Sequence, residues 1–302
     1  MKKTLIIIAM LAITTAMGVA ADNSNFSRES FTLGTTTLLY RRADICHDGT
    51  VPALVLYLHG GSARGNDNEK QLGDVAVGII HQYLHNHNIN STLIVPQCPA
   101  GGGWTGTLRR VVNELLKSYV AAGNGDADRI YVVGGSMGGT GTWCQLSNYP
   151  DFYAAAMPVA GNPTGMDAAN VATTPVYTVM GTADNIMSIE AVETFRAAVI
   201  AAGGTIILDI ETGWTHQNTC EQSYTGQRLE WLFSHTRNEV PALTGDVNGD
   251  GAVDGGDVNT LINIVLGKMS GDEVNGRNDV NSDGTVDGSD INALINIILK
   301  AN

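Results

Sequence analysis

A serine set among glycines carries the clearest chemical signal in this chain. The stretch Gly134-Gly-Ser-Met-Gly-Gly139 follows the β-branched run 129–133 and precedes a helical pattern over residues 140–148. A G-x-S-x-G sequence between a strand and a helix forms a tight elbow, because the glycines let the backbone turn while the serine hydroxyl is pushed into solvent. The pattern therefore predicts that Ser136 is a nucleophile rather than part of a structural turn.

A serine hydroxyl attacks only weakly unless an imidazole takes its proton, and the imidazole needs a carboxylate to hold its tautomer. In the α/β-hydrolase fold the acid and then the histidine follow the serine along the chain. Asp184 comes after the β-branched run 176–180, and His216 comes after the run 206–210. Both are expected on loops at the carboxyl edge of a sheet, where ligands bind in such folds. The sequence thus predicts a triad of Ser136, Asp184 and His216.

Acyl transfer through a serine also needs N–H donors for the oxyanion. Met137, directly after the nucleophile, is expected to provide one of them. The second is expected from His59-Gly-Gly-Ser62, which ends the strand pattern 53–58, with Gly61 as first choice and Ser62 as second. His59 itself is expected to support this turn and not to act as the base.

The elements that must position these residues follow from the alternation of short β-branched runs with longer amphipathic ones between residues 22 and 240. Such alternation is typical of a mostly parallel sheet covered by helices on both faces. Strands are expected over residues 36–45, 53–58, 92–95, 129–133, 154–159, 176–180 and 206–210. Helices are expected over residues 108–121, 140–148, 189–202 and 224–234. We predict an α/β domain over residues 22–240 with no insertion long enough to form a lid.

A second chemical pattern is duplicated near the end of the chain. The acidic loop 246–257 returns 33 residues later as 279–290, with nine of twelve positions identical. Oxygen-bearing side chains at loop positions 1, 3, 5, 9 and 12, with Gly at position 6, suit a hard cation such as Ca²⁺. The predicted ligands are Asp246, Asn248, Asp250, Ala252 and Asp257 in the first loop and Asp279, Asn281, Asp283, Thr285 and Asp290 in the second.

Each loop leads into an amphipathic run with apolar residues at helical spacing. These residues are Val258, Leu261, Ile262 and Val265 after the first loop and Ile291, Leu294, Ile295 and Ile298 after the second. The two helices are expected to pack on each other in a module over residues 246–302. Residues 241–245, which contain Pro241, are the predicted linker to it.

The composition and the amino-terminal residues indicate the compartment in which the protein functions. The formal charge is −13, and residues 244–302 account for −7 of it, so no basic surface for nucleic acid is expected. Residues 1–20 read as a signal peptide cleaved after Ala20 or Ala21, with a single membrane anchor as the alternative. The apolar run is short and is broken by Thr14-Thr15, so no stable membrane span is expected after cleavage. A secreted or extracellular protein follows, with periplasm or cell surface possible.

Four cysteines remain in a compartment where disulfides persist. They are Cys46, Cys98, Cys144 and Cys220. Their spacing has no zinc-binding pattern, and at least one structural disulfide is expected, with three pairings possible.

Two resemblances add to this interpretation. The segments 128–143 and 149–161 resemble secreted bacterial esterases related to polyhydroxybutyrate depolymerases, feruloyl and acetylxylan esterases, and prolyl-oligopeptidase-like hydrolases, and the similarity spans about residues 50–235. Residues 244–302 resemble a type I dockerin, which implies calcium as cofactor and a cohesin-type receptor as partner. As in dockerins, position 12 is Asp and no helix enters the loop. Positions 10 and 11 hold Gly255-Gly256 and Gly288-Ser289, where dockerins usually carry recognition residues such as Ser-Thr, so the cohesin partner stays open.

Together these features predict a secreted serine esterase acting on acetyl or feruloyl esters of plant cell-wall polysaccharide. Trp104, in Gly101-Gly-Gly-Trp-Thr-Gly106, is expected on the active face, where its ring either stacks on a sugar or phenolic acyl group or has a structural role. The alternatives are a small serine peptidase on the same scaffold and a non-catalytic binding protein. The chain has no room for the propeller of an oligopeptidase, and the intact triad argues against a binding protein.

Overall fold

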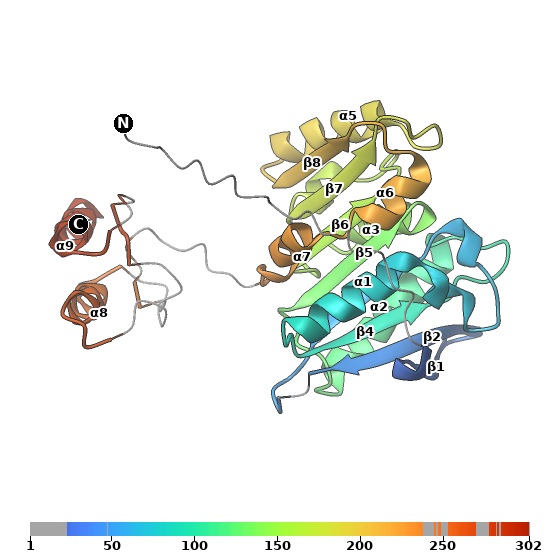
Figure 1. Cartoon of the computed structure of the whole chain (residues 1–302), viewed down its shortest axis with the longest axis horizontal. Helices are drawn as coiled ribbons and strands as arrows, with labels where there is room; N and C mark the ends of the chain where they lie inside the picture. The colour runs from blue at the N-terminus through green and yellow to red at the C-terminus, as the bar shows by residue number, and fades with distance from the viewer. Residues whose placement is uncertain are drawn as a thin grey trace, which may run out of the picture. The chain divides into compact units, whose positions relative to one another are not determined.

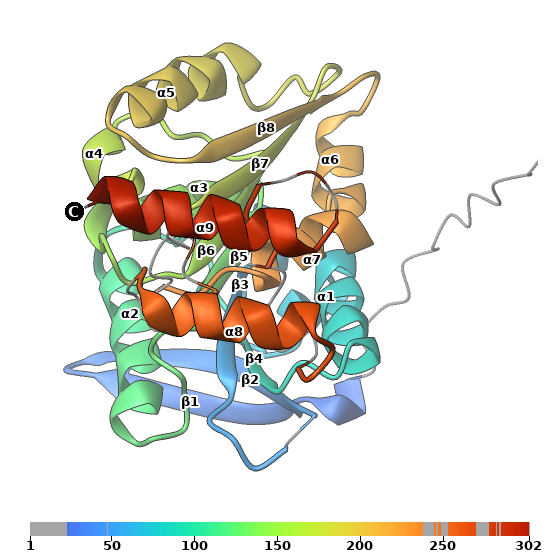
Figure 2. The ribbon, with the colours of Figure 1, turned by 90° about the vertical axis from the view of Figure 1, so that its left-hand side faces the viewer.

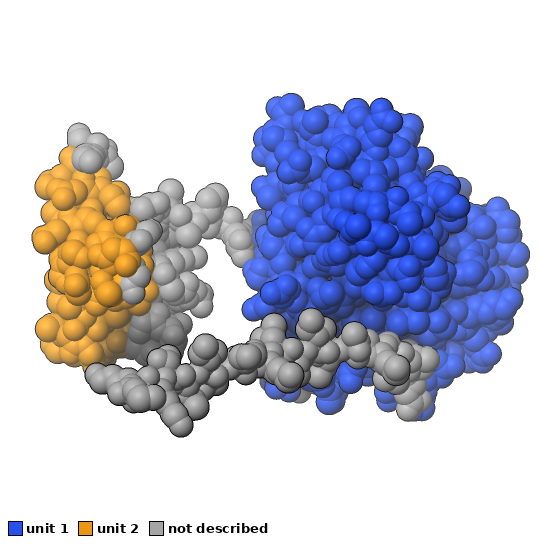
Figure 3. Space-filling view, turned by 45° about the horizontal axis from the view of Figure 1, so that its top comes forward, with its two compact units in different colours: residues 1–237 blue, residues 238–302 orange. Residues whose placement is uncertain are grey.

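The structure, a computed structural model, describes residues 23–46, 48–237, 245, 247–248, 253–269, 278–281, 283 and 285–301. The chain divides into two compact units, residues 1–237 and 238–302, which Figure 3 draws in separate colours. No helix among the described residues is long and apolar enough to cross a membrane. The predicted signal peptide and residues 241–244 of the predicted linker lie outside the described residues, so both stay predictions.

One sheet of eight strands organises the first unit (Figure 1). Its strands are β1 Ser27–Leu33, β2 Thr36–Ile45, β3 Ala53–Leu58, β4 Ser91–Pro96, β5 Ile130–Gly135, β6 Ala155–Val159, β7 Val176–Gly181 and β8 Ile206–Glu211. Their spatial order is β1-β2-β4-β3-β5-β6-β7-β8. β2 runs antiparallel to both of its neighbours, and every pair from β4 to β8 is parallel. The predicted, mostly parallel sheet is therefore confirmed.

Helices cover both faces of this sheet (Figure 2). They are α1 Val75–Asn86, α2 Gly106–Ala121, α3 Met137–Asn148, α4 Ala168–Val171, α5 Ile189–Ala201, α6 His216–Gln222 and α7 Gly226–Phe233. α1, α6 and α7 lie on one face, and α2 to α5 lie on the other. Each face buries its own apolar cluster, because the central strands β3 and β5 are buried along their whole length and present apolar side chains to both sides.

All seven predicted strands are present, with ends shifted by at most two residues. The ranges predicted from the sequence include neither β1 nor the helices α1, α4 and α6. β1 is an edge strand in which no residue is fully buried, so it lacks the apolar signal of an inner strand. α6 is only seven residues long and polar in sequence, and it begins with a capping box between Thr215 and Asn218.

The register of the parallel strands places their carboxyl ends along one edge. Gly134 pairs with Leu58 on one side and Pro158 on the other, and Gly181 pairs with Glu211. The loops after β3, β5, β7 and β8 therefore leave the sheet at the same edge. These are the loops that carry the predicted oxyanion turn, nucleophile, acid and base.

The second unit contains two helices that lie side by side (Figures 1 and 2), α8 Gly255–Val265 and α9 Gly288–Ala301. Leu261 and Leu294 are fully buried between them, together with Val247. The predicted packing of the two helices is confirmed. Ile295 departs from the expected apolar stripe, because 38% of its surface is exposed.

The expected disulfide is wrong, since all four cysteines are free thiols. Cys46 follows β2, Cys98 follows β4, Cys144 lies in α3 and Cys220 lies in α6. A disulfide requires two Cβ atoms about 4 Å apart. The fold instead distributes these residues over separate elements, with α3 and α6 on opposite faces of the sheet.

Gly138 gives a direct test of how tightly the elbow is packed. A Cβ atom built on Gly138 lies 1.7 Å from the Leu58 carbonyl oxygen, whereas one built on Gly226 meets nothing within 4 Å. We expect Gly138→Ala to lower the free energy of unfolding by about 3 kcal/mol or more. The matched variant Gly226→Ala should change it by less than about 1 kcal/mol. Urea denaturation measures both, and equal midpoints for Gly138→Ala and wild type would contradict the close packing.

Candidate active site

The predicted elbow is present where β5 meets α3. Ser136 has φ 58° and ψ −117°, and non-glycine residues rarely adopt a positive φ. The Ser136 N–H donates to the Val159 carbonyl (3.0 Å), and its carbonyl accepts from the Thr140 N–H (3.0 Å), so strand and helix hold the turn from both ends. This strained conformation turns the Ser136 side chain away from the buried sheet.

The side chains of the three predicted triad residues lie in one hydrogen-bonded chain. The His216 Nε2 and Ser136 Oγ atoms are 2.8 Å apart, and the His216 Nδ1 and Asp184 Oδ2 atoms are also 2.8 Å apart. The Asp184 side chain is fully buried, and 15% of the His216 side chain is exposed. Such a chain can hold the imidazole with Nε2 free to take the serine proton.

The Asp184 carboxylate is satisfied although it is buried. Its second oxygen, Oδ1, accepts from the backbone N–H groups of Ile186 (2.8 Å) and Met187 (3.0 Å). Hydrogen bonds to both oxygens offset the cost of burying the charge. These hydrogen bonds therefore fix Asp184 in the orientation that His216 requires.

Close contacts hold the Asp184 loop against the loop before His216. The Ala183 N–H donates to the Trp214 carbonyl (3.0 Å), and the Gly213 N–H donates to Thr182 Oγ1 (2.7 Å). Gly181 allows this approach, since a Cβ atom there would lie 2.2 Å from the Trp214 oxygen. His216 was predicted on a loop but is the first residue of α6, so a helix as well as a loop fixes its position.

The predicted oxyanion donors border the same region. Met137 opens α3, and Gly61 and Ser62 open the short 3-10 helix η2 (Gly61–Ala63), where the first N–H groups have no acceptor within the helix. Gly60, Gly61 and Ser62 line the cavity that contains Ser136. Which of these N–H groups meets an oxyanion stays a prediction.

The His59 side chain supports the turn of residues 59–62 through two hydrogen bonds. Its ring is fully buried, with Nε2 accepting from the Cys98 N–H (2.9 Å) and Nδ1 within 2.6 Å of the Gly60 carbonyl oxygen. Since Nε2 is an acceptor, Nδ1 carries the hydrogen and donates to Gly60. Burial lowers the pKa of His59, which favours this neutral form.

Trp104 does not line this cavity, and the predicted stacking on substrate is wrong. Only 1% of its surface is exposed, its Nε1–H donates to the His59 carbonyl (2.9 Å), and its Cβ would collide with any side chain at Gly141. The ring fills the space between α3 and the turn that begins His59-Gly60-Gly61, called the HGG turn below. Its role is structural, the second of the two possibilities that the sequence left open.

The cavity in front of Ser136 has a volume of about 420 Å³, within the range of small-molecule sites. Besides Ser136, His216 and Gly60 to Ser62, its lining includes residues that the sequence analysis did not assign to the site, among them Tyr57, Asp74, Ile186, Gln217, Cys220 and Glu221. Ile186 is exposed over 65% of its surface and forms an apolar rim. The described lining residues include two carboxylates and no lysine or arginine.

Asp74 connects this cavity to the oxyanion turn. Its Oδ2 accepts from the Gly60 N–H (3.1 Å) and from the Tyr57 hydroxyl (3.0 Å). Asp74 occupies the N-cap position of α1, yet its side chain makes no capping hydrogen bond there. The carboxylate instead fixes the backbone immediately before Gly61. Its only sequence signal was its position before a helix, which would have suggested capping.

Cys220 is the second nucleophilic side chain near the triad, with its Sγ 4.0 Å from His216 Nε2. Burial, reinforced by the charge of Asp184, raises the pKa of the Cys220 thiol to about 12. The thiol is therefore neutral at physiological pH. Ser136 Oγ, at 2.8 Å, lies closer to His216 Nε2 than Cys220 Sγ does.

The acidic loops of the second unit form a separate candidate site. Asp290, the predicted last ligand, is fully buried, with Oδ1 accepting from the Asn281 N–H (3.1 Å) and Oδ2 from the Asp287 N–H (2.9 Å). Asp257 makes the equivalent pair of bonds in the first loop. The sequence duplication is therefore a duplication of structure.

The predicted calcium ligands can be compared with these loops only in part, because Asp246, Asp250 and Ala252 lie outside the described residues. No group of three or more His, Cys, Asp or Glu side chains is gathered as a metal would require in the part of the chain that is described. Asp283 Oδ1 accepts from the N–H and hydroxyl of Thr285 (2.9 and 2.6 Å). The predicted ligand atoms of the second loop are nevertheless all oxygens, and Ca²⁺ prefers oxygen ligands.

Comparisons with known proteins agree with both parts of this description. Residues 102–230 match the model of the dienelactone hydrolase family, and residues 244–299 match that of the dockerin type I domain. A comparison with curated proteins gives no match.

Three solved structures illustrate the fold of the first unit. A thermostable esterase is similar with a TM-score of 0.63 and 23% identity, over 71% of this chain and 64% of its own. An acylaminoacyl peptidase in complex with a chloromethyl ketone has a TM-score of 0.53 and 13% identity, over 70% and 42%. A mutant feruloyl esterase module from Clostridium thermocellum, complexed with sinapinate, has a TM-score of 0.52 and 17% identity, over 69% and 87%. The predicted α/β-hydrolase fold is confirmed.

The bonds of Asp74 lead to a prediction about activity. Asp74→Ala should lower kcat/KM for p-nitrophenyl acetate about 10- to 100-fold, because the turn before Gly61 loses its acceptor. Asp74→Asn keeps an oxygen for the Gly60 N–H and should retain activity within about threefold. Steady-state kinetics, with thermal denaturation as a control for folding, compare the two variants. Equal losses in both would show that the charge of Asp74 matters and not its hydrogen bond.

Proposed function

From a chain that joins an α/β-hydrolase domain of the dienelactone hydrolase family to a dockerin type I domain, we propose a secreted serine esterase that cleaves acetyl or feruloyl esters on plant cell-wall polysaccharide. The observation that carries this proposal is the chain of 2.8 Å contacts from Ser136 through His216 to buried Asp184, at a cavity of about 420 Å³. The sequence predicts no insertion long enough to form a lid, and an uncovered cavity suits an ester on a bulky polymer.

In the proposed reaction, Ser136 Oγ attacks the acyl carbon while its proton passes to His216 Nε2. Asp184 stabilises the imidazolium through Nδ1–H. The oxyanion accepts from the Met137 N–H and from the N–H of Gly61 or Ser62. His216 then gives its proton to the leaving alkoxide, which leaves the acyl group on Ser136. Water, activated by the same imidazole, releases the acid and restores the serine.

The charges that line the cavity favour an uncharged acyl group. Asp74 and Glu221 both face it, and no lysine or arginine stands among its described lining residues. An acyl group that carries its own carboxylate would meet like charges in a partly desolvated site. Acetyl and feruloyl groups carry no such charge.

The dockerin domain supports the extracellular and polysaccharide-linked part of the proposal. We infer that the second loop holds Ca²⁺ through Asp279, Asn281, Asp283, Asp290 and the carbonyl of Thr285, and that the first loop does so through its equivalent positions. The ion would tie each loop to the start of the helix that follows. A cohesin-type receptor is the proposed partner of the assembled module.

Replacement of the nucleophile tests whether the protein is an enzyme at all. Ser136→Ala should lower kcat for p-nitrophenyl acetate at least about 1000-fold, because the group that forms the acyl-enzyme is lost. Ser234→Ala, which removes an exposed hydroxyl at the end of α7, serves as the matched control and should keep wild-type activity. Undiminished hydrolysis by Ser136→Ala would leave a binding function as the better alternative.

A substrate panel separates the esterase from the peptidase. We expect acetylated xylan or methyl ferulate to be cleaved with kcat/KM at least about 100-fold above that for aminoacyl anilides, measured by acid release and by absorbance. A preference for the anilides would favour the peptidase. The same fold also occurs in an acylaminoacyl peptidase.

Removal of calcium tests the independence of the two units. Chelation should unfold the module of residues 246–302, because its loops then contain uncompensated carboxylates, while ester hydrolysis should change by less than about twofold. Circular dichroism and p-nitrophenyl acetate turnover on the full chain follow both events. A loss of turnover in parallel with the loss of helix signal would show that the catalytic unit depends on the module.

A further inference from the structure

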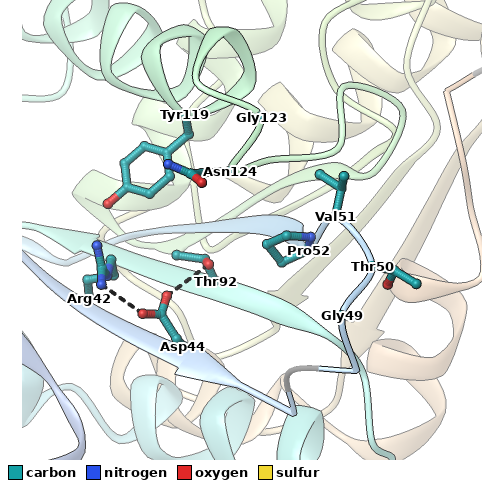
Figure 4. A pocket seen from close by; sticks show the side chains of 10 residues that line it. All are labelled: Arg42, Asp44, Gly49, Thr50, Val51, Pro52, Thr92, Tyr119, Gly123 and Asn124. Carbon is teal, nitrogen blue, oxygen red and sulfur yellow. Dashed lines mark hydrogen bonds and ion pairs between the residues drawn. The ribbon is translucent and has the colours of Figure 1, made fainter.

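Figure 4 shows the residues that line a second cavity, of about 390 Å³, in the first unit. This cavity lies at the edge of the sheet opposite to the one that carries Ser136. Thr92 near the start of β4 and the loop 49–52 before β3 both line it, whereas Ser136 follows the end of β5. Because these strands are parallel, their full length separates the two cavities, on the order of 20 Å. The cavity therefore takes no part in the site described above.

The floor of this cavity consists of polar side chains from β2 and β4. Arg42 Nη2 and Asp44 Oδ2 are 2.8 Å apart, and the Thr92 hydroxyl donates to Asp44 Oδ1 (3.0 Å). About a third of each charged side chain remains exposed, 35% for Arg42 and 31% for Asp44. The pair thus presents fixed donors and acceptors to a ligand while its charges cancel.

One wall is the loop 49–52, and hydrogen bonds hold it in shape. The Thr50 N–H and hydroxyl both donate to Asp48 Oδ1 (2.9 and 2.6 Å). The Val51 carbonyl accepts from Arg129 Nη2 (2.7 Å), and the Pro52 carbonyl accepts from the Asp126 N–H (2.8 Å). Val51 is 45% exposed and adds an apolar surface. A wall held in this way loses little conformational entropy when a ligand binds.

The other wall comes from the end of α2 and the turn after it. Figure 4 shows the Tyr119 ring and the Asn124 side chain on this side, with Arg42 and Asp44 on the strand. The Tyr119 hydroxyl lies 3.1 Å from that of Tyr40, which fixes the ring. The exposed Asn124 side-chain amide offers two donors and an acceptor.

We propose that this cavity binds a neutral oligosaccharide segment. A sugar ring presents an apolar C–H surface between hydroxyl groups, which matches the Tyr119 ring beside the polar groups of Asp44, Arg42 and Asn124. The cancelled charge of the Arg42–Asp44 pair disfavours an anionic ligand, since no second cation is found among the described lining residues. This site goes beyond the proposed esterase function. It would hold a polysaccharide chain away from the ester that is cleaved.

Isothermal titration calorimetry on the full chain with Ser136→Ala, titrated with xylohexaose and with cellohexaose, tests the proposal without turnover. We expect binding of at least one of them that weakens at least tenfold in Asp44→Asn and in Asn124→Ala. Glu190→Gln, in an unrelated cavity on α5, is the matched control and should bind as the parent does. Equal binding by all variants would place the ligand elsewhere and overturn the proposal, as would no binding by any of them.

A charged sugar provides a second readout that a merely structural role of Asp44 would not change. Glucuronic acid-bearing xylooligosaccharides should bind the parent no more tightly than neutral ones, but Asp44→Asn, which leaves Arg42 without its counter-charge, should reverse this preference. Tighter binding of the charged sugar by the parent would contradict a neutral ligand. In chains that keep Ser136, hydrolysis of p-nitrophenyl acetate should be equal for wild type, Asp44→Asn and Asn124→Ala. This comparison separates a failure of the present proposal from a failure of the esterase function.

Discussion

The contact between the Gly138 backbone and the Leu58 carbonyl sets the geometry of the catalytic unit. It brings the start of α3 directly against the end of β3, closer than any side chain at position 138 would permit. The elbow and the HGG turn therefore share one packed backbone surface. Because interiors are close-packed and hardly compressible, this contact fixes the position of Ser136 relative to Gly61 more firmly than any single hydrogen bond does.

The carboxylates near this contact lie in two different environments. Asp184 is buried, and its oxygens are all engaged by two N–H groups and an imidazole, so its charge serves to orient His216. Asp74 and Glu221 face the cavity, where their charge acts on whatever enters. Both arrangements use a carboxylate, but burial and full hydrogen bonding make the first a fixed support for His216. We propose that the two half-buried carboxylates at the cavity influence selectivity instead.

The two edges of the sheet carry different chemistry. Parallel strands direct the loops with the proposed nucleophile, acid and base to the carboxyl edge, as a sheet of this kind does. The amino edge, together with the antiparallel strand β2, forms a polar cavity with an aromatic wall and a neutral charge balance. The proposed polysaccharide substrate is long enough to meet both edges. The duplicated acidic loops belong to a separate unit, so tethering need not disturb the chemistry.

The sequence by itself determined seven of the eight described strands to within two residues, the order Ser136, Asp184 and His216, and the duplicated acidic loops, because β-branching, helical spacing and loop chemistry are properties of neighbouring residues. Trp104 shows where such local patterns fail. Its glycine-rich surroundings read as an exposed loop, yet the slot that buries it is opened by Gly141 on another element. The carboxylate of Asp74, the separation of the four cysteines and the cavity between β2 and α2 were likewise decided only by the tertiary structure. Burial and the direction of a side chain depend on which distant segments pack together, and that information lies in the assembled sheet and its helices rather than in any one stretch of sequence.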